Sequence, residues 1–226
     1  MDEAYGPVDA PVKELMTVSA QLECEAPAAD DQTRTTLTDD GKGGKVIWSE
    51  GDTIGAVSGD GTVTACVASE IDGECATFQV PTDTEYAVYP FVEGMKFNTT
   101  RKALDYTLPS EVTLDGSKKV FGNKENVMCA HLLNNNLSFR NLCGYIEVKL
   151  KGTGTVKHVA LRNNSGTWDA LSGLGTIDFS DADEPKITTG TDHGSTYNFS
   201  YATCSNVALS TEEATSFYFI VPPHTY

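Results

Sequence analysis

The four histidines are the first residues to test for acid–base chemistry, because imidazole titrates near neutral pH. His131, His158, His193 and His224 lie far apart in the sequence, and none belongs to an HExxH pair. The chain also has no GxSxG nucleophile elbow, no Walker A loop and no GxGxxG loop. We therefore predict a protein without catalytic residues that is not an enzyme.

Acidic residues gather in one stretch that has the ligand types of a calcium site. Asp178, Asp181, Asp183 and Glu184 could supply several carboxylate oxygens from a single loop. Their spacing does not match an EF-hand, so we interpret them as a solvated acidic turn. Glu50 and Asp52 flank Gly51 and are likewise read as turn residues. We predict neither a metal site nor a cofactor.

Six cysteines are present, at positions 24, 66, 75, 129, 143 and 204, and none has the CxxC spacing of a zinc site. Cys66 and Cys75 face each other if Ser69 to Asp72 forms a hairpin loop, and they are out of register if Asp72 and Gly73 form the turn. The other four lie in apolar contexts, which favours buried free thiols.

Aromatic residues offer a ligand-binding surface of a different kind. A sugar-stacking platform could be formed by Trp48, Tyr86, Tyr89, Trp168 and Tyr201. On strands with alternating side chains, however, aromatic residues are more often part of a core. Both interpretations remain open at this point.

Composition narrows the class of protein. The 226 residues include 16 basic and 32 acidic side chains, and the net charge of −16 disfavours binding to nucleic acid. No apolar run approaches the length of about 20 residues that a membrane-spanning helix needs. The first residues lack the features of a signal peptide and the last ten end on a strand-and-turn pattern, so we expect both ends to be trimmed.

Short apolar runs separated by 20 glycines, 9 prolines and many small polar residues predict an all-β protein. The clearest alternation lies within Leu137 to Gly152, where Ile146, Val148 and Leu150 alternate with charged residues. We predict a central strand of a β-sandwich here, with Thr155 to Leu161 as its hairpin partner. Residues 93–126 show little periodicity and predict a long surface excursion.

An earlier strand is predicted from Leu15 to Glu23, where the apolar residues Met16, Val18, Ala20 and Leu22 alternate with polar ones. Further strands are expected around Lys45 to Ser49, Thr53 to Val57, Tyr86 to Phe91, Gly173 to Phe179, Tyr197 to Leu209 and Phe217 to Val221, with a hairpin from Thr62 to Phe78.

One stretch, TRTTLTDDGKGGKVIWSEGDTIGAV from Thr33 to Val57, resembles the opening of the fimbrillin family, which comprises type V pilins and their minor or anchor relatives in Bacteroidales. The family's later landmarks follow in order: YAVYPF, then NVMCA before LSFRNLCGYIEVKL, then LSGLGTIDF and FYFIVPPHTY. The ordered set extends to Tyr226, so the resemblance covers most of the chain.

The resemblance implies a fold with two domains. Residues 1–13 would be a flexible leader, and residues 14–166 an N-terminal transthyretin-like β-sandwich. Residues 167–226 would begin a second β-sandwich domain, which we expect to be incomplete.

The resemblance also implies a function. Family members are exported as lipoproteins. A protease then cuts the chain after an arginine and so removes the first strand, and the subunits assemble into a fimbrium by donor-strand exchange. Arg34 occupies the matching position, and Met16, Val18, Ala20 and Leu22 would be the apolar side chains of that first strand. The resemblance thus implies an adhesive pilus subunit at the cell surface, anchored to the outer membrane by lipid or through the fibre.

The implied partners are other pilus subunits and ligands on host or bacterial surfaces, and no nucleic acid. The alternative is a surface glycan-binding lipoprotein that does not polymerise. Exposure of Trp48 and Trp168 on one face would favour that alternative, whereas their burial would favour a structural role.

Overall fold

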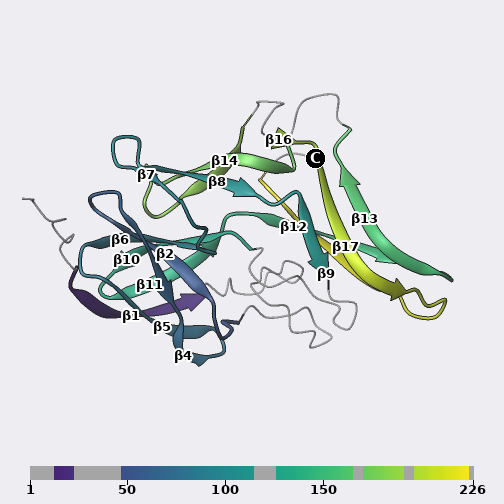
Figure 1. The fold of residues 1–226 in the computed structure, drawn as a ribbon, viewed down its shortest axis with the longest axis horizontal. Helices are drawn as coiled ribbons and strands as arrows, with labels where there is room; N and C mark the ends of the chain where they lie inside the picture. The colour runs from purple at the N-terminus through teal and green to yellow at the C-terminus, as the bar shows by residue number, and fades with distance from the viewer. Residues whose placement is uncertain (1–12, 23–46, 115–125, 165–169, 191–195, 224–226) are drawn as a thin grey trace, which may run out of the picture.

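The computed structural model describes residues 13–22, 47–114, 126–164, 170–190 and 196–223, and these residues form eighteen strands and no helix. The protein is therefore all-β, as the sequence predicts. Eight strands join into one sheet, which lies on the left in Figure 1. Their order is β3 (Val63–Val67), β2 (Thr53–Ser58), β6 (Thr84–Tyr89), β10 (Met128–Leu133), β11 (Asn136–Asn141), β1 (Leu15–Leu22), β5 (Cys75–Pro81) and β4 (Ser69–Asp72).

This sheet curls into a shape that is nearly a barrel. Its two outermost strands, β3 and β4, follow each other in the chain with only Ala68 between them. The Ala68 amide donates a hydrogen bond of 2.8 Å to the Asp52 carbonyl at the start of β2. The two edges of the sheet are therefore held near each other by the chain itself.

The remaining strands form three smaller sheets. One has the order β15 (Lys186–Thr189), β14 (Ser172–Asp178), β8 (Ala103–Leu108) and β7 (Phe97–Asn98), with β16 (Thr196–Tyr197) also paired to β14. The others are β13 (Thr155–Arg162), β17 (Phe199–Ala208) and β9 (Glu111–Leu114), and the pair β12 (Gly144–Leu150) and β18 (Thr215–Val221). The β13 and β17 strands extend to the right in Figure 1.

Three hydrophobic cores correspond to these layers. The first fills the inside of the eight-stranded sheet and contains Trp48, Phe78 and Phe139. The second lies between the outer face of that sheet and the β8–β14 layer, where Leu104 and Ile177 are fully buried. The third is formed by β12 and β18 together with β13, β17 and β9.

Burial on one or two faces explains the sequence patterns of the strands. In β6, Ala87 and Tyr89 face the first core while Tyr86 and Val88 face the second, so residues 86–89 form a continuous apolar run. In β1 only one face is covered, and apolar residues alternate with exposed polar ones.

Two predictions about strand pairing are wrong. The stretch from Leu137 to Gly152 is two strands in different sheets, since β11 ends at Asn141 and β12 begins at Gly144. β12 pairs with β18, and β13 pairs with β17 instead of forming a hairpin with β12. The physical reason is that the alternation of side chains fixes which face is buried but not which strand lies alongside.

Two further predictions also need correction. Within residues 93–126, described up to 114 and again at 126, the chain forms β7, β8 and β9, and Leu104, Tyr106 and Leu108 are buried. These residues alternate with polar ones on β8 and so belong to a core layer, not to a surface excursion. The predicted strand around Lys45 to Ser49 is not formed in its described part, residues 47–49.

The sheets cross the predicted domain boundary near residue 166. β8, β9 and β12 precede this position, and they pair with β14, β17 and β18, which follow it. The described strands on either side are thus joined by backbone hydrogen bonds in three sheets.

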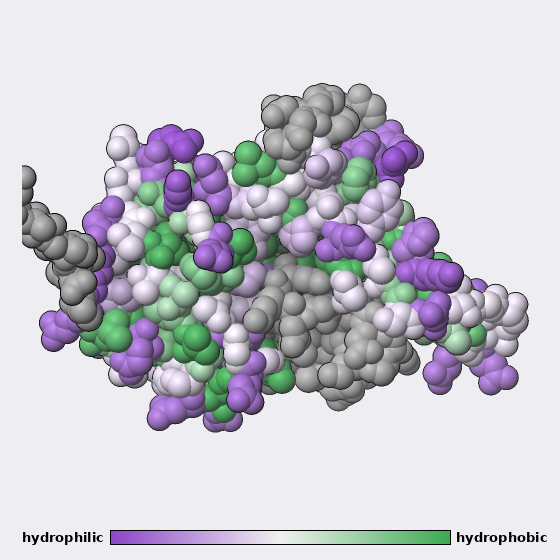
Figure 2. Space-filling model, in the orientation of Figure 1, coloured by the Kyte–Doolittle hydropathy of each residue, from purple (hydrophilic) through white to green (hydrophobic). Residues whose placement is uncertain are grey.

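The surface gives no large apolar area in the view of Figure 2, where hydrophilic and hydrophobic residues are interspersed. The exposed large apolar side chains among the described residues come from separate elements: Leu15, Val67, Val92, Leu133, Leu174 and Tyr197. The described part of the chain contains no helix that is long and apolar enough to cross a membrane.

Candidate functional site: the seat of strand β1

Strand β1 lies inside the eight-stranded sheet although it is close to the start of the chain. It pairs antiparallel with β5, from Leu15 opposite Pro81 to Gln21 opposite Cys75. On its other side its second half pairs in parallel with β11, from Ser19 opposite Asn136 onward. Backbone hydrogen bonds therefore hold β1 along both edges.

The inward face of β1 closes one wall of the first core. Val18 is 1 % exposed, Ala20 is 1 % exposed and Leu22 is 3 % exposed, and all three belong to the core cluster. Met16 is partly buried and packs against the same cluster. The four residues predicted for the first strand thus share one face.

Trp48 stands at the centre of this core. Its ring packs edge-on against Phe78 at 5.3 Å, Tyr89 at 5.5 Å and Phe139 at 5.3 Å between ring centroids. With 2 % of its surface exposed, the ring has no open face on which a sugar could stack. The prediction that Trp48 belongs to a ligand platform therefore has no support in this structure, and Trp168 lies outside the described residues.

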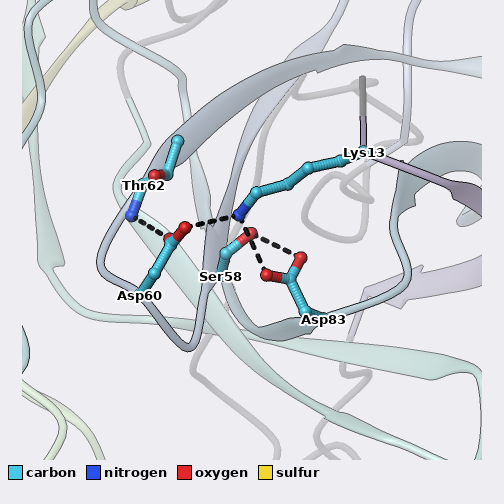
Figure 3. A network of polar contacts seen from close by, with 5 residues as sticks. All are labelled: Lys13, Ser58, Asp60, Thr62 and Asp83. Carbon is cyan, nitrogen blue, oxygen red and sulfur yellow. Dashed lines mark hydrogen bonds and ion pairs between the residues drawn. The ribbon is translucent and has the colours of Figure 1, made fainter. Parts of the chain in front are cut away.

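A cluster of charged residues fastens the start of β1 (Figure 3). The ammonium group of Lys13 donates hydrogen bonds of 2.9 Å to Oδ2 of Asp60 and of 2.9 Å to Oδ2 of Asp83. Asp60 lies between β2 and β3, and Asp83 lies between β5 and β6. We call Lys13, Asp60 and Asp83 the clamp, because they join β1 to two turns at one end of the sheet.

Both carboxylates of the clamp also accept hydrogen bonds from groups outside β1. The Thr62 amide donates to Oδ1 of Asp60 at 2.8 Å, and the Ser58 hydroxyl donates to Oδ1 of Asp83 at 2.9 Å. The hydrogen bonds from Lys13, together with those from Thr62 and Ser58, lower the pKa of Asp60 to about 2 and lower the pKa of Asp83. The Lys13 pKa is raised by its own hydrogen bonds to Asp60 and Asp83.

Sequence reasoning missed the clamp because it placed Lys13 in a flexible leader. A usable signal was present in the sequence. Lys13 stands directly before an alternating strand, while Asp60 and Asp83 each lie in a short polar segment between two apolar runs. Strand ends and turns meet at the same edge of a sheet, but which turns meet there is decided by the strand order.

The structure places the other predicted site residues apart from β1 or outside the described ranges. Arg34 lies in the undescribed segment 23–46 that follows β1. His131 stacks on Tyr86, and its Nδ1 lies 3.9 Å from Oδ1 of Asp183. His158 is on β13, and the remaining two histidines are outside the described residues.

The acidic stretch caps its own turns. The Ser180 amide donates to Asp178, and the amides of Asp183 and Glu184 donate to Asp181. No group of three or more possible metal ligands occurs within the described ranges.

Comparisons with protein-family models, curated proteins and solved structures found no match.

The cysteines of the described residues are free thiols. β4 and β5 form a hairpin with Asp72 opposite Cys75, so Gly73 lies in the turn and Cys66 is outside this hairpin. Cys66 is buried, whereas Cys75 is exposed on the outer face. Of the two arrangements considered from the sequence, the one without a Cys66–Cys75 bridge is the one observed.

Proposed function

We propose that this protein is a structural and adhesive subunit of a cell-surface fimbrium, and that β1 is a replaceable strand. In this proposal, cleavage after Arg34 frees β1, and a strand from another subunit takes its place by donor-strand exchange. The observation that carries the proposal is the position of β1, which is paired on both edges and buried on one face and is followed by the segment that contains Arg34.

We call the position of β1 between β5 and β11 the β1 seat. The contacts made there suit a strand that stays in place until it is exchanged. Val18 and Leu22 each contribute about 1.5–3 kcal/mol from burial. Each backbone hydrogen bond to β5 and β11 adds about 0.5–1.5 kcal/mol. A bound strand with these contacts would therefore leave slowly after its covalent link to the rest of the chain is cut.

Loss of β1 would leave a vacancy that favours a new strand. The facing edges of β5 and β11 would expose unpaired amide and carbonyl groups, and Phe78 and Phe139 would lose cover on one side. Such an edge pairs readily with an extended segment of another chain. Addition of a strand restores both the hydrogen bonds and the core.

The finer features of the proposal come from the fimbrillin resemblance. They are a transthyretin-like sandwich as the first domain, a second β-sandwich domain, export as a lipoprotein and a place at the outer membrane in the fimbrium. The all-β fold with several stacked sheets is compatible with them.

Cleavage at Arg34 tests the proposal. The full chain is treated briefly with an arginine-specific protease, and its mass and oligomeric state are followed by mass spectrometry and by size-exclusion chromatography with light scattering. We expect oligomers to appear in step with loss of the fragment that ends at Arg34. The Arg34→Gln variant, treated in the same way, is expected to remain monomeric.

The proposal is wrong if the cleaved protein stays monomeric and fully folded at high concentration while oligomerisation conditions are varied. It is also wrong if the Arg34→Gln variant and the parent chain form oligomers to the same extent.

A further inference from the structure

The apolar alternation of β1 does not by itself fix where an incoming strand sits. A shift by one residue turns the apolar side chains to the solvent, so it is strongly disfavoured. A shift by two residues keeps the same face inward and leaves three of the four apolar positions filled. A contact at the end of the strand would add to the discrimination between the correct register and the slipped ones.

The clamp has the geometry for this role. Lys13 Nζ lies 2.9 Å from Oδ2 of both Asp60 and Asp83. A slip of two residues moves the lysine along the strand by about 6–7 Å, at about 3.3 Å for each residue. That displacement exceeds the range of a hydrogen bond, and both contacts would be lost together.

The two acceptors are oriented by parts of the protein other than β1. Thr62 and Ser58 each hold one oxygen of a clamp carboxylate and leave the second oxygen directed at Lys13 (Figure 3). The backbone adds a further link between the two turns, because the Gly59 amide donates to the Asp83 carbonyl at 3.0 Å. The carboxylate pair would therefore remain in place after β1 has left.

We propose that Asp60 and Asp83 read the register of the strand that occupies the β1 seat. The partner strand carries a lysine or arginine five positions before the first of its three fully buried side chains, as Lys13 stands before Val18. This inference rests on the proposed function, since it describes the strand that replaces β1. It adds a chemical criterion for the partner: a basic residue followed by an alternating apolar segment.

The size of the buried side chains contributes to the same selection. Ala20 lies opposite Ala76 on β5 and opposite Leu137 on β11. A slipped strand would bring a valine or leucine to this position, and excess volume in a packed core is destabilising. The partner strand is thus expected to have a small residue two positions after its first buried one.

A native thiol makes the register measurable. Gln21 lies opposite Cys75, which is free and exposed. The test uses the full chain with Cys24→Ser, cut after Arg34. A synthetic peptide of residues 10–23 that carries Gln21→Cys is added in excess under mild oxidation, and the disulfide to Cys75 is quantified by mass spectrometry. A second peptide carries Ser19→Cys instead and reports a strand slipped by two residues.

Each peptide is made with lysine at position 13 and with Lys13→Gln. With lysine, we expect the Gln21→Cys peptide to form the bridge to Cys75 about 3–10-fold more than the Ser19→Cys peptide, at about 0.05 M salt. With Lys13→Gln this preference should shrink to the part that the fit of the buried side chains supplies. At about 1 M salt the preference of the lysine peptides should shrink, because the charges are screened.

The matched control is a chain with Asp60→Asn and Asp83→Asn, checked for an unchanged fold by circular dichroism. Asparagine retains the oxygen that Thr62 or Ser58 contacts but lacks the charge. On this chain the lysine and glutamine peptides should behave alike.

The outcomes separate the two proposals. If the peptides bridge to Cys75 but Lys13→Gln leaves the register preference unchanged, the clamp does not read register and the replaceable strand stands. If none of the peptides displaces the bound fragment, the replaceable strand fails and the register proposal fails with it.

Discussion

The phenol hydroxyl of Tyr89 donates a hydrogen bond of 2.8 Å to Oδ1 of Asp52 within the eight-stranded sheet. Asp52 is only 3 % exposed, and its Oδ2 accepts a hydrogen bond of 2.8 Å from the Ser49 amide. Burial and the neighbouring Asp52 raise the Tyr89 pKa. The pair thereby fixes the turn that leads from Trp48 into β2 and links it to β6.

Removal of this hydroxyl should destabilise the protein. In Tyr89→Phe the ring still packs against Trp48, but Oδ1 of Asp52 loses its buried donor. We expect a loss of about 1–3 kcal/mol in the free energy of unfolding, measured by urea denaturation. Tyr197→Phe is the control, because Tyr197 is 41 % exposed and should change stability little. Equal stabilities of the two variants would contradict this account of Asp52.

Two leucines on β1 allow a matched comparison of its two faces. Leu22 is 3 % exposed and belongs to the first core, whereas Leu15 is 56 % exposed. We expect Leu22→Ala to reduce the free energy of unfolding by about 2–5 kcal/mol. Leu15→Ala should have an effect within about 0.5 kcal/mol. In the chain cut after Arg34, Leu22→Ala should also speed release of the fragment; similar release rates for both variants would argue against burial as the source of retention.

Acid should weaken the hydrogen bonds of the clamp, because it protonates Asp60 and Asp83. The Asp60 pKa is lowered from 3.8 to about 2, and the Asp83 pKa is lowered as well. A carboxylate whose pKa is lower in the folded state stabilises that state above its ordinary pKa and loses this contribution as the pH falls toward the lowered value. Retention of the fragment in the cut chain should therefore be steady down to about pH 4 and fall between about pH 4 and about pH 2.

Lys13→Gln separates this effect from general acid unfolding. The variant lacks the partner that lowers both pKa values, so the difference in retention between it and the parent chain should be largest above pH 4 and vanish near pH 2. A difference that stays constant over this range would contradict the role of the two carboxylates.

Thiol labelling should distinguish Cys75 from the other described cysteines. Burial raises the pKa of Cys66 to about 11 and of Cys143 to about 12, and it raises the pKa values of Cys129 and Cys204. Few of these thiols are ionised at pH 8, and the thiolate is the reactive form. Brief treatment with iodoacetamide at pH 8, followed by peptide mass spectrometry, should modify Cys75 first. Rapid labelling of Cys129 in the folded protein would contradict its burial.

The strands that were predicted well are those whose environment is visible in local sequence. β1 alternates because one face meets water, β2 is bounded by glycine and aspartate turns, and β14 is followed by an acidic turn. The apolar neighbours of Cys129 in the sequence predict a buried thiol, and Cys129 is buried. In each of these cases a short window of residues contains the physical reason.

The parts that sequence reasoning missed depend on contacts between distant segments. Nothing near Val148 shows that β12 pairs with β18, because a strand's partner is set by the assembly of the whole sheet. The sequence predicts a surface position for Leu104 and Tyr106, because the strand that contains them is short and its neighbours in the sequence are polar. The clamp was missed for the same reason, as Lys13, Asp60 and Asp83 meet only once three segments are folded.

The parallel pairing of Ser19 with Asn136 joins segments that are half the chain's length apart. β1 can therefore acquire both neighbours only after the ends of this long loop have come together. Loops of this size close slowly, and the contacts they permit form late in folding. Until β11 is in place, the segment from Met16 to Leu22 has β5 as its only partner strand, and the first core stays open along one edge.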